Sequence, residues 1–148
     1  MSEIQVKKIL LPIDGSESSI KAARYAVKIA KQEKAQIICI HAIGTPAYIS
    51  EYRGPLLLPA YYDDIKKLAQ EWFARVIEIA KRENIEVKTD VLLDVVSVVD
   101  TIVNYAKNEN VDMIVIGTKG RTALKRFLLG SVANGVVLHA HCPVLVVR

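Results

Sequence analysis

The stretch KILLPIDGSESSIKAARYAVKIAKQEKAQIICIHAI, residues 8–43, contains two short apolar runs separated by a helical pattern. Residues 8–13 and 35–43 have the length and composition of buried strands, and the first run ends in the turn cluster Asp14-Gly15-Ser16. Between them, apolar residues recur at three- and four-residue steps over residues 18–31, which predicts an amphipathic helix. A strand, a helix and a strand in this order predict a parallel crossover unit.

The same alternation continues to the end of the chain. Further strands are expected at residues 85–93, 112–117 and 143–148, and further helices at residues 63–83, 97–108 and 131–139. The helix at 97–108 opens with a capping box formed by Ser97 and Asp100. We therefore expect one α/β domain over residues 1–148, with an open parallel five-stranded sheet, helices on both faces, and a long variable loop at about residues 44–62.

Length and composition narrow the class of protein. A chain of 148 residues with 51% hydrophobic and 24% charged residues is typical of a single folded domain. The net charge is +4, and the segment after residue 112 holds five basic residues and no acidic one. These are Lys119, Arg121, Lys125, Arg126 and Arg148. An anionic partner is therefore expected there, although no dense basic tract with interleaved aromatics indicates nucleic acid.

Two cysteines, Cys39 and Cys142, stand far apart and predict neither a disulfide framework nor a zinc site, so we expect both to be buried as small hydrophobic residues. No metal site is expected elsewhere either. The first residues lack the apolar core of a signal peptide, and no apolar run approaches 18 residues. We expect a cytoplasmic protein with no membrane partner.

Three glycines and a serine follow the fourth predicted strand in the pattern Gly-x₂-Gly-x₉-Gly-Ser, as Gly117, Gly120, Gly130 and Ser131. Ligands of open parallel sheets bind outside the carboxyl ends of the strands, which is where this segment falls. We expect Gly117 to leave room for a ligand, Gly120 to adopt a positive φ, and Gly130 to let the backbone approach a phosphate. Ser131 is expected to cap the last helix, whose first N–H groups would face an anion.

Two alternatives stay open for this segment. The glycines could serve only as turns, and the cations Lys125 and Arg126 could belong to a solvated helix face. Lys119 and Arg121 lie on the loop itself, where they could attract phosphate or could also belong to a solvated face. The segment is not a Walker A loop, because it has no Gly-Lys-Ser/Thr tripeptide.

Two polar side chains end the first two strands. Asp14 could accept hydrogen bonds from ribose hydroxyls or an adenine amino group, or it could serve only as a turn or capping acid. His41 is interpreted as a satisfied, partly buried histidine rather than a catalytic one.

Together these residues resemble the universal stress protein family, and in particular its ATP-binding branch. The resemblance spans nearly the whole chain and rests on residues 7–16, 40–42, 111–117, 130–132 and 142–147. It implies a Rossmann-like sheet of the adenine nucleotide α-hydrolase-like type, with strand order 3-2-1-4-5. One departure is Asp94-Val-Val-Ser-Val-Val, where many members carry a glycine.

The resemblance also implies a site and a partner. Adenine and ribose contacts would fall on Pro12, Asp14 and Ala42, and phosphate contacts on Gly117, Gly120, Gly130, Ser131 and Val132. The implied ligand is ATP, with or without Mg²⁺, and the implied partner is a second copy of the chain paired through the strand Val144–Val147. 

The function expected from this reasoning is a nucleotide-dependent regulatory module in a stress response, with at most slow ATP hydrolysis. One alternative is a low-turnover ATPase or phosphotransferase that uses a serine or threonine near the loop. The other is a nucleotide-free dimeric scaffold whose binding surface is the tyrosine-rich loop.

Overall fold

The computed structural model describes residues 3–44, 58–93, 95–118 and 129–148. Within them, five parallel strands form one sheet in the order β3-β2-β1-β4-β5. The strands are β1 (Lys8–Pro12), β2 (Gln36–Ala42), β3 (Val87–Leu92), β4 (Met113–Gly117) and β5 (Val144–Val147). The helices are α1 (Glu17–Glu33), α2 (Leu58–Lys81), α3 (Val98–Asn108) and α4 (Ser131–His139). This architecture confirms the predicted α/β fold and strand order.

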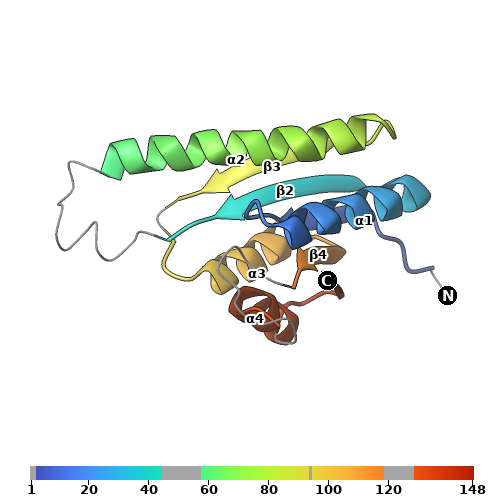
Figure 1. Cartoon of the computed structure of the whole chain (residues 1–148). Helices are drawn as coiled ribbons and strands as arrows, with labels where there is room; N and C mark the ends of the chain where they lie inside the picture. Colours follow the sequence, from blue (N-terminus) through green and yellow to red (C-terminus); the bar gives the residue numbers. More distant parts are fainter. Residues whose placement is uncertain (1–2, 45–57, 94, 119–128) are drawn as a thin grey trace.

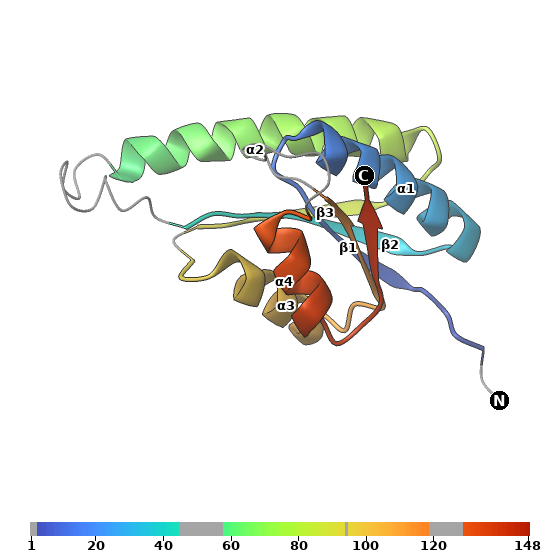
Figure 2. The same cartoon turned by 60° about the horizontal axis from the view of Figure 1, so that its bottom comes forward.

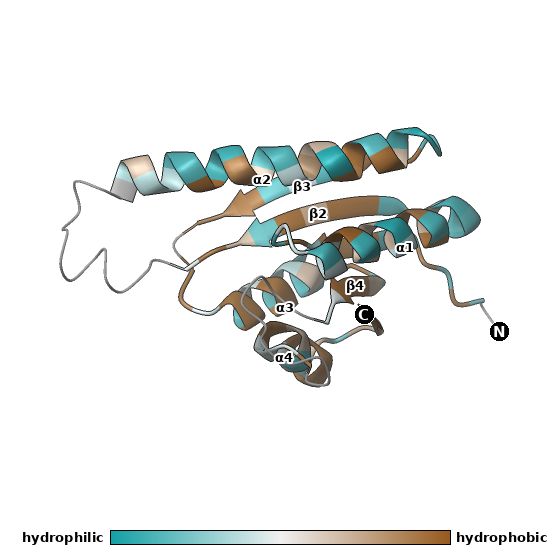
Figure 3. Cartoon of the chain, viewed as in Figure 1, coloured by the Kyte–Doolittle hydropathy of each residue, from teal (hydrophilic) through white to brown (hydrophobic). Residues whose placement is uncertain are grey.

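The helices cover the sheet on both sides (Figure 1). Ile9 and Leu11 of β1 are buried in a core with α1 and α2, while Leu10 is buried in a second core with α3 and α4. Strands buried on both faces are almost continuously hydrophobic, as Figure 3 shows for β2. In α1 and α2, by contrast, hydrophobic and hydrophilic residues alternate along the helix. Because side chains on both faces of the central strands are buried, these strands are continuous apolar runs in the sequence.

Serine side chains fix the start of two helices. Ser16 is the N-cap of α1, and its hydroxyl accepts a hydrogen bond from the Ser19 N–H at 3.2 Å. Ser97 caps α3 in the same way, accepting from the Asp100 N–H at 3.1 Å, as its sequence predicts. Each cap satisfies one of the N–H groups that a helix leaves without a partner at its start.

Helix α2 begins five residues earlier than expected, at Leu58 rather than Asp63. Pro59 had indicated a loop, but proline is tolerated in the first turn of a helix because the N–H that it lacks has no partner there anyway. Residues 58–62 of the expected loop are therefore helical, while residues 45–57 lie outside the described part. In both views α2 extends past the carboxyl ends of β2 and β3 (Figures 1 and 2).

Helices α3 and α4 touch at a glycine. A Cβ on Gly135 of α4 would lie 2.7 Å from Val99 Cγ2 and 2.8 Å from Val99 Cγ1. The valine side chain is branched at Cβ and stiff, so it has no easy way to move aside. The missing side chain of Gly135 sets the distance between the two helices.

Replacing Gly135 by alanine should lower the free energy of unfolding by about 1 kcal/mol, because overpacking outweighs the better helix propensity of alanine. Urea unfolding would measure the change. In a Val99→Ala background the same replacement should become stabilising, since the contact has been removed. A stabilising effect in the unaltered chain would contradict the close contact.

Candidate functional site

A cavity of about 540 Å³ opens at the carboxyl ends of β1, β2 and β4. The βα turns and the first turns of the helices surround it, which is where ligands bind in open parallel sheets. The described residues predicted as site residues from the sequence all line this single cavity. They are Pro12, Asp14, Ala42, Gly117, Gly130, Ser131 and Val132. Gly120, Lys119 and Arg121, with Lys125 and Arg126, lie outside the described residues.

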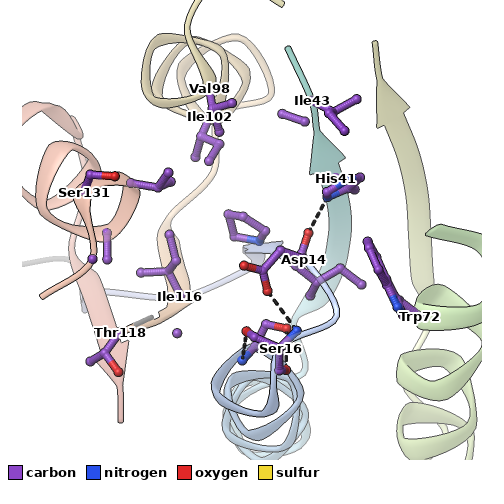
Figure 4. Close-up of a pocket in the computed structure, with 18 of the residues that line it drawn as sticks. Asp14, Ser16, His41, Ile43, Trp72, Val98, Ile102, Ile116, Thr118 and Ser131 are labelled. Carbon is purple, nitrogen blue, oxygen red and sulfur yellow. Dashed lines mark hydrogen bonds between the residues drawn. The ribbon is translucent and has the colours of Figure 1, made fainter. Parts of the chain in front are cut away.

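The cavity has an apolar wall and a polar rim (Figure 4). The wall includes Ile43, Ile65, Trp72, Val98, Ile102 and Ile116. The rim includes the carboxylate of Asp14 and the hydroxyls of Ser16, Thr118 and Ser131. A mostly apolar pocket with a few placed polar groups is the usual form of a small-molecule site.

Asp14 occupies the turn between β1 and α1. Its Oδ1 accepts a hydrogen bond from the Ser16 N–H at 2.9 Å, so the carboxylate does stabilise the turn. An ionised carboxylate has further acceptor positions, and Asp14 also faces the cavity. Among the described lining residues it is the single charged side chain. The turn role and a ligand role are therefore compatible.

The expected role of Gly117 needs correction. A Cβ at this position would lie 2.6 Å from Ser18 Oγ, 2.8 Å from the Ser18 carbonyl carbon and 2.9 Å from the Ser19 N. These atoms belong to the first turn of α1. Gly117 lines the cavity, but the room left by its missing side chain is occupied by α1 rather than kept open for a ligand.

The expected cap of α4 also needs correction. The N-cap is Gly130, with φ −58° and ψ 154°, no side chain caps the helix, and Ser131 is the first helical residue. Both serine and glycine are acceptable at an N-cap, so the sequence alone did not distinguish one position from the other. The consequence is that the Ser131 side chain does not use up an N–H group of the first turn.

The first turn of α4 therefore differs from those of α1 and α3. The Gly130 N–H donates to the Thr118 carbonyl at 2.7 Å, and the first helical bond runs from the Asn134 N–H to the Gly130 carbonyl at 2.9 Å. The N–H groups of the three residues between them precede that first helical bond. These N–H groups belong to the first turn of a helix that lines the cavity, and the N-terminus of a helix favours anions.

Two residues of the wall come from α2, which sequence reasoning did not connect with the site. Ile65 and Trp72 lie seven residues apart on the helix and both line the cavity. A spacing of seven residues is typical of one buried helix face, but nothing in the sequence shows which end of the sheet that face covers. His41 is 8% exposed, lines the same wall, and has its Nδ1 2.7 Å from the Ile13 carbonyl oxygen. This agrees with its interpretation as a satisfied histidine.

The cysteines lie away from the cavity lining. Cys39 is fully buried, and burial raises the pKa of its thiol well above the usual range. Cys142 is only partly buried, contrary to expectation, and burial likewise raises its pKa.

Among the described residues no cluster of three or more His, Cys, Asp or Glu could hold a metal ion. In the same part of the chain, no helix combines the length and the apolar character needed to cross a membrane.

The fold is that of an α/β protein with a cavity at the switch point of a parallel sheet, between β1 and β4. The sequence profile of the Universal stress protein family matches residues 5–148. Universal stress protein MJ0531 of Methanocaldococcus jannaschii is 36% identical over 148 residues, covering 96% of this chain and 82% of the relative. Universal stress protein YxiE of Bacillus subtilis is 34% identical over 146 residues, covering 95% and 98%. The chain belongs to the universal stress protein family.

Solved structures share this fold. UspA from Lactobacillus plantarum has a TM-score of 0.85 at 27% identity, covering 99% of this chain and 100% of that protein. A universal stress protein in complex with cAMP has a TM-score of 0.67 at 23% identity, covering 97% and 98%. The universal stress protein from Archaeoglobus fulgidus in complex with dAMP has a TM-score of 0.68 at 20% identity, covering 99% and 100%. The last two identities are low and show a shared fold.

Proposed function

We propose that this universal stress protein is a cytoplasmic regulatory module that binds ATP, with or without Mg²⁺, in the cavity at the ends of β1, β2 and β4. The observation that carries the proposal is the first turn of α4. It has no side-chain cap and starts at a cavity with an apolar wall.

The phosphates are assigned to the first turn of α4. Two requirements of an anion site meet there: N–H groups not used by the helix, and the positive end of a helix dipole. The Gly130–Thr118 backbone bond ties this turn to the end of β4. A phosphate bound there would receive charge-assisted hydrogen bonds, which are stronger than neutral ones.

The base and the ribose are assigned to the remaining walls. An adenine ring has two apolar faces, which suit the side chains of Ile43, Val98 and Ile102. Asp14 carries a carboxylate, which can accept hydrogen bonds from ribose hydroxyls. The complexes of related folds with cAMP and dAMP support an adenine nucleotide as the class of ligand.

A regulatory role requires that the nucleotide binds two states of the protein with different affinity. An assembly of two copies offers such a second state. β5 forms the outer edge of the sheet, and Val137 and Leu138 of the neighbouring α4 are exposed. An uncharged edge strand beside exposed apolar side chains is suited to pairing with another strand. We therefore extend the proposal to a homodimer through Val144–Val147.

ATP, ADP and AMP should each raise the melting temperature of the purified protein, whereas GTP should have a smaller effect. A ligand at one hundred times its dissociation constant stabilises the folded state by about 2.7 kcal/mol. Thermal unfolding with and without Mg²⁺ measures this, and isothermal titration gives the affinities. A folded protein that responds to no adenine nucleotide would contradict the proposal and favour the nucleotide-free scaffold. Sustained phosphate release from ATP would instead identify a slow ATPase.

A further inference from the structure

Trp72 of α2 reaches the turn that carries Asp14. It is the single tryptophan of the chain, packs partly buried against the core of α1 and α2, and lines the cavity. In Figure 4 its side chain lies below His41 and to the right of Asp14. None of the ligand contacts proposed for the base, the ribose or the phosphates involves Trp72.

The indole ring packs directly against the backbone of Gly15. Gly15 has φ +81°, a conformation that side chains other than glycine rarely adopt. A Cβ there would lie 2.5 Å from Trp72 Nε1 and 2.6 Å from Trp72 Cζ2. The residue after Asp14 is therefore held from one side by Trp72.

His41 holds the residue before Asp14. A carbonyl oxygen only accepts hydrogen bonds, so His41 Nδ1 carries a hydrogen and donates it to the Ile13 carbonyl at 2.7 Å. The imidazole meets the indole edge to face, with ring centroids 5.0 Å apart and an interplanar angle of 86°. The Ile13 N–H in turn donates to the Ile40 carbonyl of β2 at 2.9 Å.

These contacts form a closed loop that includes Asp14. His41 holds the residue before it, Trp72 holds the residue after it, and the two rings contact each other. We propose that Trp72, acting through Gly15 and supported by His41, is a positioning residue that fixes the Asp14 carboxylate for the ribose hydroxyls of a bound nucleotide. The inference rests on the proposed function. Its physical basis is that hydrogen bonds to a preorganised group spend no binding free energy on ordering that group.

The test compares two probes, AMP and 2′,3′-dideoxy-AMP, by isothermal titration of the full chain. Trp72→Leu should weaken AMP binding about tenfold, the value of one hydrogen bond to a charged group, and change dideoxy-AMP binding less than about twofold. Asp14→Asn should show the same selectivity. The double variant should weaken AMP binding no further, because both changes remove one interaction.

Ile65→Ala is the matched control, since Ile65 lines the same cavity from the same helix two turns away. It should affect both probes equally. Should Trp72→Leu fail to fold, Trp72→Phe keeps an aromatic ring in the core, withdraws the atoms that touch Gly15, and should show a smaller loss confined to AMP.

Equal weakening of both probes by the Trp72 variants would overturn the inference, because Trp72 would then be only a wall of the cavity. The inference would also be overturned if a Trp72 variant lost folding stability but kept the unaltered chain's preference for AMP over dideoxy-AMP. If the unaltered chain binds both probes equally, Asp14 does not recognise the ribose and the inference fails while nucleotide binding stands. If it binds neither probe and does not bind ATP or ADP either, the proposed function itself is wrong.

Discussion

Replacing Ser131 by proline should weaken AMP binding about thirtyfold, equivalent to about 2 kcal/mol, and leave the binding of adenosine unchanged. Proline removes the N–H of the first residue of α4, which the helix itself does not use. The helix should persist, because proline is favourable at this position and Gly130, at φ −58° and ψ 154°, already has the extended conformation required before proline. Isothermal titration with the two probes measures the phosphate contribution alone.

Ser131→Ala is the control, because it keeps the N–H and removes only the hydroxyl. We expect a loss of AMP affinity below about threefold for this variant, since a single neutral hydrogen bond is at stake. Equal losses for alanine and proline would place the hydroxyl, rather than the backbone, on the phosphate. No loss for proline in a folded protein would exclude the first turn of α4 as the anion site.

Replacing Gly117 by alanine should lower the free energy of unfolding by about 3 kcal/mol, at the upper end of the range for overpacking. The added methyl would meet backbone atoms of Ser18 and Ser19 below 3.0 Å, and a helix backbone cannot rotate away as a side chain can. The loss should be present without any ligand. Chemical denaturation of the ligand-free protein is the measurement.

Gly44→Ala offers a milder comparison, because among the described residues its Cβ would meet only the Val95 carbonyl oxygen, at 3.1 Å. We expect a cost below about 1 kcal/mol there. If Gly117→Ala kept its stability and lost only nucleotide binding, Gly117 would instead act as the sequence first suggested, by leaving space for a ligand.

The sequence predicted the elements of the fold because both faces of the sheet are buried. Apolar runs such as residues 8–13 and 35–43 can satisfy that requirement only as central strands, and the helical pattern between them leaves a parallel crossover as the natural connection. The predicted start of α2 was wrong because proline breaks the interior of a helix but is acceptable in the first turn, where Pro59 lies. Sequence alone does not show which case applies.

Much of the candidate site followed from the same logic, since the βα turns must meet at one edge of a parallel sheet. Asp14, Ala42 and Ser131 line one cavity although they are far apart in the chain. The interpretation of Gly117 was wrong because a glycine shows that space is needed, but not what fills it. Trp72 was not predicted to line the cavity. The helical spacing shows that its side of α2 is buried, but where Trp72 lies along the sheet depends on how far α2 extends.

The contact between Gly135 and Val99 has a kinetic consequence. Helix α4 is held at its middle by α3 and at its start by the bond between Gly130 and Thr118. Its first turn therefore needs no refolding before an anion can bind, so we expect association to approach the rate of diffusional encounter. Differences in affinity among nucleotides should then appear mainly as differences in residence time.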